Sequence, residues 1–354
     1  MGLEDLGYGP WFESKRKALA LEGFAMARVI AEHKGSYRVK DAAGEYLATI
    51  TGRQMFDALS REDYPAVGDW VAITEHGEKQ AIINRVLPRK TVLKRKYSDR
   101  FESQVIAANI DRVFVIESFD RDYNLNRIER CLAIADDGGI RPVIVMNKVD
   151  LISEAEVNSK ISQVKKRFKD IDVIKTSVIL ENGLHELSAC ILKAETHCLL
   201  GSSGVGKSSL INRLLGSDVI RTNTISHQTG KGKHTTTARE MHFLANGGIL
   251  IDNPGMREIG MTDSEEGIEE AFKEIRVLAE RCRFKDCTHE HEPGCAVRDA
   301  VASGELDEKR YENYLKLVKE AEYYEMTRLE KRRKDQQFGR FIRKAKEQQK
   351  REGS

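Results

Sequence analysis

Short runs of alternating apolar and polar residues fill the chain between about Phe24 and Pro88. Glycines separate these runs, and the pattern is typical of half-buried strands. The expected strands are 27–33, 36–41, 45–51, 68–74 and 79–87. Five short strands in so little chain predict a small closed barrel of the OB type, although an SH3-like barrel fits the same pattern. The barrel could bind single-stranded nucleic acid or serve only as a rigid spacer, because a fold alone does not define a function.

A second pattern follows the barrel, in which continuous apolar runs alternate with amphipathic segments. The apolar runs predict strands at 111–117, 142–146, 172–175, 198–200 and 248–251, with a helix at 126–136. Alternating strands and helices are typical of a parallel sheet with helices on both faces.

The last part of the chain is mainly helical. Tyr311, Tyr314, Leu315 and Val318 follow the spacing of one helix face and predict an amphipathic helix. The changes of pattern predict a multidomain chain with four segments. These are an N-terminal extension at 1–23, an OB-like barrel with a basic linker (Arg89–Lys96) at 24–96, an α/β domain at 97–262, and a helical metal-binding domain with a basic tail at 263–354.

The segment Gly201–Ser208 reads GSSGVGKS and fits the phosphate-loop pattern G-x-x-x-x-G-K-[ST]. It follows a short predicted strand and opens an amphipathic helix, which is the context that the motif requires. Backbone N–H groups of such a loop point at phosphate oxygens, and Lys207 is expected to reach the β- and γ-phosphates while Ser208 ligates Mg²⁺. The expected nucleotide contacts are Gly201, Ser202, Ser203, Gly204, Val205, Gly206, Lys207, Ser208 and Ser209.

The tetrapeptide Asn147–Asp150 reads NKVD and follows a predicted strand. Guanine offers two adjacent N–H donors that one carboxylate can accept, whereas adenine does not, so Asp150 favours guanine. Asn147 could bond the base edge or brace the phosphate loop, and the stem of Lys148 could cover the base face. Backbone groups at Thr176 and Ser177 could contact the guanine oxygen. The expected base contacts are Asn147, Lys148, Val149, Asp150, Thr176 and Ser177.

Two further segments are expected to contact the γ-phosphate and the Mg²⁺ of a nucleoside triphosphate. Asp252, in the sequence DNPG, could hold Mg²⁺, and the N–H of Gly255 could sense the γ-phosphate. A hydroxyl from Thr235–Thr237 is the second expected Mg²⁺ ligand, with Thr236 as the selected candidate, although this loop could instead be a solvated hairpin.

Three cysteines and a histidine lie close together near the C-terminal end. The spacing Cys282-x4-Cys287-x-His289-x5-Cys295 suits one structural Zn²⁺ held by three thiolates and an imidazole. His291 is an alternate ligand, and free buried thiols are the alternative interpretation.

Charge and composition exclude several classes of protein. The chain has 354 residues, is 40% hydrophobic and 32% charged, and carries a net charge of +2. It has no apolar run of about 18 residues and no signal-like N-terminus, so we expect a cytoplasmic protein without disulfides or membrane spans. Residues 327–354 contain 11 Lys/Arg and 4 Asp/Glu. Such a tail favours a polyanion partner or forms a solvated charged helix.

The order of the motifs is unusual, because NKVD begins 54 positions before the phosphate loop. Circular permutation of a P-loop GTPase explains this order, since a sheet can close wherever the chain is cut. A barrel, a permuted GTPase domain and a Cys/His cluster together resemble the bacterial ribosome small-subunit-dependent GTPase A family. One mild departure is Lys233, where the resemblance leads us to expect an arginine before His234.

The resemblance implies a late assembly factor that docks on the small ribosomal subunit and its rRNA and hydrolyses GTP to GDP faster there, and we expect a monomer. One alternative is a GTP-dependent RNA-binding scaffold with little turnover, and another is a permuted GTPase with a different RNA or protein partner. Met256 occupies the position at which many GTPases carry a water-orienting glutamine. His234 is therefore the candidate for positioning water, unless it serves packing or RNA contact. The candidate catalytic set is His234, Lys207 and Asp252.

Overall fold

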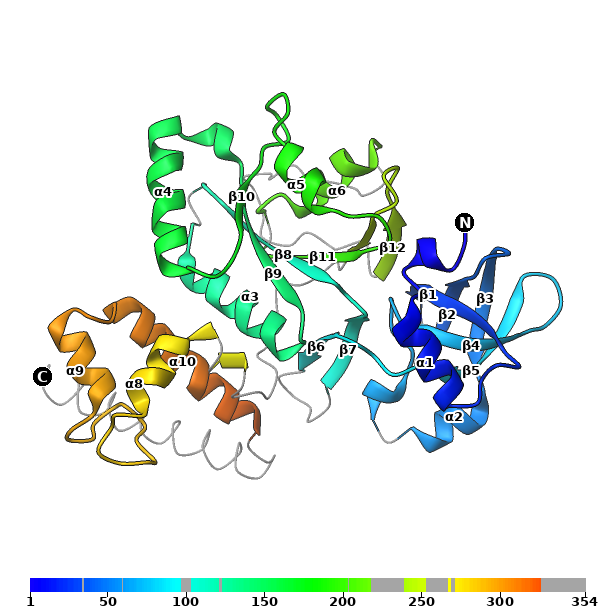
Figure 1. Ribbon diagram of the computed structural model, residues 1–354, viewed down its shortest axis with the longest axis horizontal. Helices are drawn as coiled ribbons and strands as arrows, with labels where there is room; N and C mark the ends of the chain where they lie inside the picture. The colour runs from blue at the N-terminus through cyan, green and yellow to red at the C-terminus, as the bar shows by residue number, and fades with distance from the viewer. Residues whose placement is uncertain are drawn as a thin grey trace, which may run out of the picture.

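The computed structural model describes residues 1–33, 35–58, 60–96, 103–120, 123–202, 204–217, 239–252, 267–268 and 271–325. Figure 1 shows a blue barrel and a group of yellow and orange helices on opposite sides of a green α/β domain. No helix among the described residues is both long and apolar enough to cross a membrane.

The N-terminal strands form the closed five-stranded barrel that the sequence predicts. The strands are β1 (Ala25–His33), β2 (Ser36–Lys40), β3 (Glu45–Ile50), β4 (Trp70–Glu75) and β5 (Gln80–Val86). They pair in the order β1-β2-β3-β5-β4, and β4 returns to pair with β1. Only the β3–β5 pairing in this ring is parallel. Alternate apolar residues, including Val39 and Ile83, fill the interior. A short helix, α2 (Gly52–Asp57), follows β3.

The N-terminal extension covers one face of this barrel. A 3₁₀ turn, η1 (Glu4–Leu6), and helix α1 (Pro10–Ala18) bring Leu6 and Phe12 against Trp70. The buried guanidinium of Arg28 donates to the carbonyl oxygens of Leu6 and Gly68. The extension is thus attached to the barrel by packing and by a buried cation.

The central domain contains the predicted parallel sheet. Its strands are β10 (Val173–Lys175), β9 (Arg141–Asn147), β8 (Arg112–Ser118), β11 (Thr196–Leu200) and β13 (Ile249–Asp252), in that spatial order. The helices are α3 (Leu125–Asp137), α4 (Glu154–Arg167), α5 (His185–Cys190) and α6 (Lys207–Leu215), and a 3₁₀ turn, η3 (Val149–Leu151), follows β9. Neighbouring residues of β8 point to opposite faces, so Val115 packs with Leu132 of α3 and Phe114 packs in the cluster that contains Leu210 of α6.

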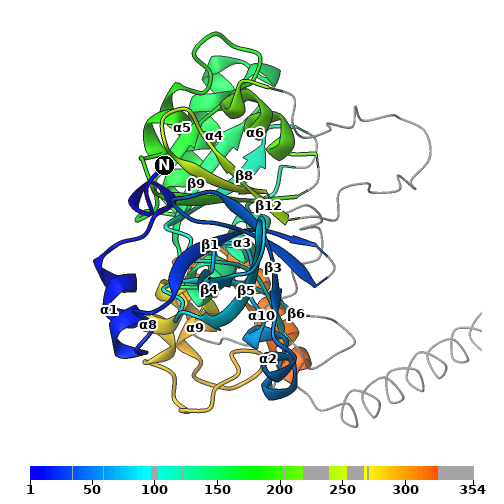
Figure 2. The ribbon, with the colours of Figure 1, turned by 90° about the vertical axis from the view of Figure 1, so that its right-hand side faces the viewer.

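One strand without a sequence signal joins the two sheets. Strand β12 (Arg239–Phe243) pairs antiparallel with β13 on one side and with β1 of the barrel on the other. The barrel and the α/β domain therefore share one sheet of eleven strands, with β12 beside β1 in Figure 2.

The prediction of a basic linker at Arg89–Lys96 is wrong. Residues Val92–Lys96 form β6, which pairs antiparallel with β7 (Ser103–Ala108). Arg89 is also committed to the fold, because its guanidinium bonds both carboxylate oxygens of the buried Asp69 at 2.7 and 2.8 Å. Leu93 is completely buried. The basic residues of this segment obscure a strand in which Leu93 is the fully buried apolar residue.

The C-terminal helices are α8 (Lys273–Ala279), α9 (Ala296–Ser303) and α10 (Glu308–Glu325). They contact the α/β domain through a buried charged network around Glu129 of α3, which is 0% exposed. Its Oε1 accepts from Arg167 of α4 at 2.8 Å and from Arg310 of α10, and its Oε2 accepts from Asn313 at 2.6 Å. Three helices from two domains thus meet at one carboxylate.

Candidate nucleotide site and metal centre

The phosphate loop lies between β11 and α6, as its sequence predicts. Two of its glycines are required by close contacts. A Cβ on Gly201 would lie 2.4 Å from the carbonyl oxygen of Ile116, and a Cβ on Gly206 would lie 2.4 Å from the side-chain nitrogen of Asn147. Both residues also have positive φ angles, of 149° and 100°. Glycine therefore lets the loop approach the neighbouring strand ends.

The first residues of α6 lie directly after this loop and contact it. Lys207 Nζ donates to the carbonyl oxygens of Gly201 and Ser202 at 2.6 and 2.7 Å, so the ammonium group lies over the loop. Ser208 and Ser209 follow in the first turn of α6, where the helix dipole favours an anion. Ser203 lies outside the described residues.

Asn147 connects the NKVD segment to the phosphate loop. Its Nδ2 donates to the carbonyl oxygen of Val205 at 2.8 Å, and its Oδ1 accepts from Thr176 Oγ1 at 3.0 Å. Asn147 is 1% exposed. Of the two predicted roles for this side chain, the structure shows the brace of the phosphate loop.

The rest of the predicted base site surrounds Asp150. Its Oδ1 accepts from Ser177 Oγ at 2.5 Å, which fixes the carboxylate orientation. The backbone N–H of Val149 donates to the carbonyl oxygen of Thr176 at 3.3 Å. Two segments about 27 residues apart in sequence thus converge because the carboxyl ends of parallel strands share one sheet edge.

Asp252 ends β13 beside the phosphate loop. Strands β13 and β11 are parallel with Ile251 opposite Cys198, which brings Asp252 level with the last residues of β11. Burial raises the pKa of the Asp252 carboxyl, and the charges of His242 and Lys207 lower it in part. The other predicted residues of the γ-phosphate side, His234, Thr235, Thr236 and Gly255, lie outside the described residues.

The four predicted metal ligands come together in the C-terminal domain. The ligand atoms of Cys282, Cys287, His289 and Cys295 all lie within 4.8 Å of one another. Cys282 Sγ is 3.9 Å from Cys295 Sγ and 3.6 Å from His289 Nδ1. A tetrahedral ion with bonds of about 2.0–2.3 Å would set ligands about 3.4–3.8 Å apart. The spacing among Cys282, His289 and Cys295 matches this, and Cys287 lies within 4.8 Å of them.

The surroundings of the cluster support a bound metal. Burial lowers the pKa of His289, which favours the neutral imidazole that a metal needs. The hydroxyl of Tyr311 in α10 donates to the carbonyl oxygen of His289 at 2.6 Å, which holds the ligand in place. His291, the alternate ligand, is exposed and is not part of this group.

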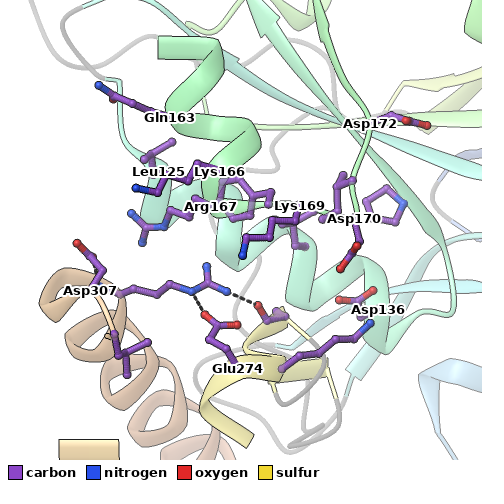
Figure 3. A pocket seen from close by; sticks show the side chains of 18 of the residues that line it. Leu125, Asp136, Gln163, Lys166, Arg167, Lys169, Asp170, Asp172, Glu274 and Asp307 are labelled. Carbon is purple, nitrogen blue, oxygen red and sulfur yellow. Dashed lines mark hydrogen bonds and ion pairs between the residues drawn. The ribbon is translucent and has the colours of Figure 1, made fainter. Parts of the chain in front are cut away.

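A separate cavity of about 930 Å³ lies between α4 and the C-terminal helices. Figure 3 shows Arg167 and Lys169 on one side, with Glu274 and Asp307 on the other. Arg310 bonds Glu274 and the carbonyl oxygen of Ala271 here. The cavity contains no residue of the phosphate loop or NKVD, so it is distinct from the nucleotide site.

The sequence patterns also miss Asp120, whose carboxylate contacts Lys148 at 2.8 Å. It belongs to no motif. Its position two residues beyond a strand that neighbours the NKVD strand is the one signal that could have identified it.

The chain is similar to a known family and to curated proteins over most of its length. A family model described as RsgA GTPase matches residues 86–262. The small ribosomal subunit biogenesis GTPase RsgA of Opitutus terrae is 42% identical over 334 residues, covering 91% of this chain and 90% of that protein. The small ribosomal subunit biogenesis GTPase RsgA 1 of Bacteroides thetaiotaomicron is 41% identical over 322 residues, covering 90% and 89%.

Solved structures lead to the same fold. The crystal structure of YjeQ from Thermotoga maritima aligns with a TM-score of 0.62 and 27% identity, covering 86% of this chain and 99% of that one. YloQ, described as a circularly permuted GTPase, aligns with a TM-score of 0.60 and 24% identity, covering 86% and 97%. The permuted order predicted from the motifs is confirmed, and the chain belongs to the RsgA GTPase family.

Proposed function

We propose that this chain is a GTP hydrolase that acts in maturation of the small ribosomal subunit, binding the subunit with GTP and hydrolysing GTP to GDP and phosphate there. The observation that carries the proposal is the bond from Asn147 to Val205, which joins the NKVD segment to the phosphate loop. The names of the relatives support the subunit as the partner. The chain would act as a cytoplasmic monomer.

Several nucleotide-site residues have distinct proposed roles. Asp150 would accept the two guanine donors, held in orientation by Ser177. Lys207 and the N-terminus of α6 would bind the phosphates. Ser208, Thr236 and Asp252 would hold Mg²⁺, which would supply positive charge to the phosphate oxygens. Gly255 would contact the γ-phosphate, and His234 would orient the attacking water, because Met256 has no group that can do so.

The four ligands Cys282, Cys287, His289 and Cys295 would hold one Zn²⁺. Three thiolates and one imidazole complete a tetrahedral shell, so the ion would stabilise the fold and leave no open position for catalysis. Metal analysis of the purified protein should give one zinc per chain, and a chain without a bound metal would contradict the assignment.

Base selectivity provides a direct test of the pocket. Asp150→Asn replaces a carboxylate, which only accepts hydrogen bonds, by an amide that accepts one and donates one. The amide therefore pairs with the N–H and C=O of xanthine. The variant should lose GTP binding by at least about 100-fold and gain XTP binding, as measured by competition against a fluorescent nucleotide. Glu154→Gln, in the first turn of α4, removes one acidic charge nearby and should bind GTP normally. Equal displacement of GTP by ATP in the wild type would contradict the proposed pocket.

The partner is tested by phosphate release under multiple turnover, with and without purified small subunits. Turnover should rise severalfold with small subunits and stay basal with large subunits. His234→Ala should lower kcat with little change in KM. Equal rates with and without subunits would favour the scaffold alternative.

A further inference from the structure

The ammonium group of Lys148 is held at two points. Its Nζ lies 2.8 Å from Asp120 Oδ2 and donates to the carbonyl oxygen of Gly204 in the phosphate loop at 2.5 Å. Both side chains of the ion pair are only about one-quarter exposed, at 24% for Lys148 and 28% for Asp120. The partial burial reduces solvent screening of the pair.

Local structure places Asp120 beside the lysine. Strands β8 and β9 run parallel with Ser118 opposite Asn147, so the two segments leave the sheet side by side. The N–H of Phe119 donates to the carbonyl oxygen of Asn147 at 3.2 Å, and the N–H of Tyr123 donates to that of Asp120 at 3.2 Å. The carboxylate therefore emerges from a backbone that is bonded on both sides.

Neighbouring side chains hold the same segment from outside. Lys160 of α4 lies 5.7 Å from the ring centroid of Phe119 and 4.3 Å from that of Tyr123. The rings of Phe119 and Tyr123 are themselves 5.7 Å apart. The chain on either side of Asp120 is thus packed against α4.

The backbone of Lys148 adds a second constraint. Its φ angle of 59° lies in the left-handed region, which a lysine rarely adopts. The start of the side chain is fixed by this turn and its end by Asp120 and Gly204. A four-carbon stem fixed at both ends loses little conformational freedom when a flat base packs against it.

We propose that Asp120 is a positioning residue of the guanine-nucleotide pocket, which holds the stem of Lys148 extended across the site where the base binds. The inference rests on the proposed function, because it requires a guanine nucleotide in this pocket. Asp120 acts through Lys148 and contributes to nucleotide affinity without taking part in the chemical step.

The test compares nucleotide affinity in full-length variants. Asp120→Asn keeps the size of the side chain and removes its charge. We expect dissociation constants for fluorescent GDP and GTP to rise together by about 3- to 10-fold, the range that ordering one long side chain represents. KM for GTP should rise to a similar degree, and kcat should change by less than twofold. Asp120→Glu should restore most of the affinity.

Two controls separate positioning from general effects. Glu181→Gln removes an exposed charge from the loop after Ser177 and should leave affinity unchanged. In a Lys148→Ala background, Asp120→Asn should have no additional effect, because the residue acts through the lysine. Melting temperatures without nucleotide identify a variant that merely unfolds.

Several outcomes would overturn the inference. These are unchanged affinity in Asp120→Asn, an effect that persists without Lys148, or tighter binding, which would mean that Asp120 holds the lysine away from the nucleotide. A wild-type chain that binds no guanine nucleotide would instead overturn the proposed function. The two failures are therefore distinguishable.

Discussion

The two neighbours of the GTPase domain are attached in different ways. The barrel is joined by backbone pairing, in which β1 and β12 place Ala31 opposite Glu240 and Glu32 opposite Arg239. The side-chain ion pairs across this barrel junction, Arg239–Glu32 at 3.1 Å and Arg38–Glu240, are partly exposed. The helical junction, in contrast, is made by side chains: apolar residues of both domains share one core cluster, and charged side chains converge on the buried Glu129.

The difference predicts how each junction tolerates change. Backbone hydrogen bonds do not depend on side-chain identity, so the β1–β12 pairing should survive most substitutions of the exposed side chains along it. A buried carboxylate is stable only while its partners neutralise it, so the helical junction should fail when one member is removed. Substitutions, metal removal and pH can test this contrast.

Metal removal should have the largest effect, and it should act on the helical side. Zinc binding to a set of three thiolates and an imidazole contributes roughly 10–16 kcal/mol in small modules. Chelation should therefore unfold the region around α8 and α9, whereas the barrel should remain folded. Hydrogen exchange measured by mass spectrometry would locate the loss. Cys190→Ser, outside the cluster, is the matched control, and a C-terminal region unchanged by chelation would contradict a structural ion.

Breaking the buried network should have the next largest effect. Glu129→Gln leaves Arg167 and Arg310 without their shared counter-charge and should lower the free energy of unfolding by about 3–5 kcal/mol. Urea denaturation measures this change. Glu305→Gln changes an exposed residue that lines the cavity beside Arg167 and Arg310, and it should cost less than about 0.5 kcal/mol. Equal costs for the two variants would remove the contrast between buried and exposed charges.

Acid should lower the stability of the protein through a buried histidine in β11, a strand of the α/β domain. His197 in β11 is completely buried against Phe114, and burial lowers its pKa to about 4. Between about pH 4 and pH 6.5 the histidine is protonated in the unfolded chain but neutral in the folded chain. The free energy of unfolding should therefore fall as pH drops from about 6.5 towards 4, by up to about 3 kcal/mol. His197→Phe should flatten that part of the stability curve. The same slope in the variant would assign it to other groups.

The exposed ion pair at the barrel junction should have the smallest effect. Arg38→Ala should lower the free energy of unfolding by less than about 1 kcal/mol, and the difference should vanish at high salt. Thermal unfolding at two salt concentrations measures it. A loss of several kcal/mol would show that charges, and not strand pairing, hold the barrel.

The features that the sequence predicts are those with a local residue pattern. The phosphate loop, NKVD and the cysteine cluster were predictable because their chemistry requires fixed residue types at short spacing. The parallel strands were predictable because burial on both faces produces continuous apolar runs.

Other features depend on contacts that no local pattern contains. Strand β12 is short and has charged residues, and it becomes a strand because it completes two neighbouring edges. Glu129 and Asp120 resemble ordinary solvated acids until the fold supplies Arg310 and Lys148 as partners. The basic segment at β6 resembles a linker in sequence because its lysines and arginine obscure the alternation around Leu93.

The shared sheet sets the distance over which the barrel and the nucleotide pocket can influence each other. Glu240 of β12 lies opposite Ala31 of the barrel on one side and opposite Asp252 on the other. Two strand spacings, about 10 Å, separate a barrel residue from the proposed magnesium ligand. A binding partner that tilts the barrel would therefore also move β13, the strand that carries Asp252, because β12 connects the two.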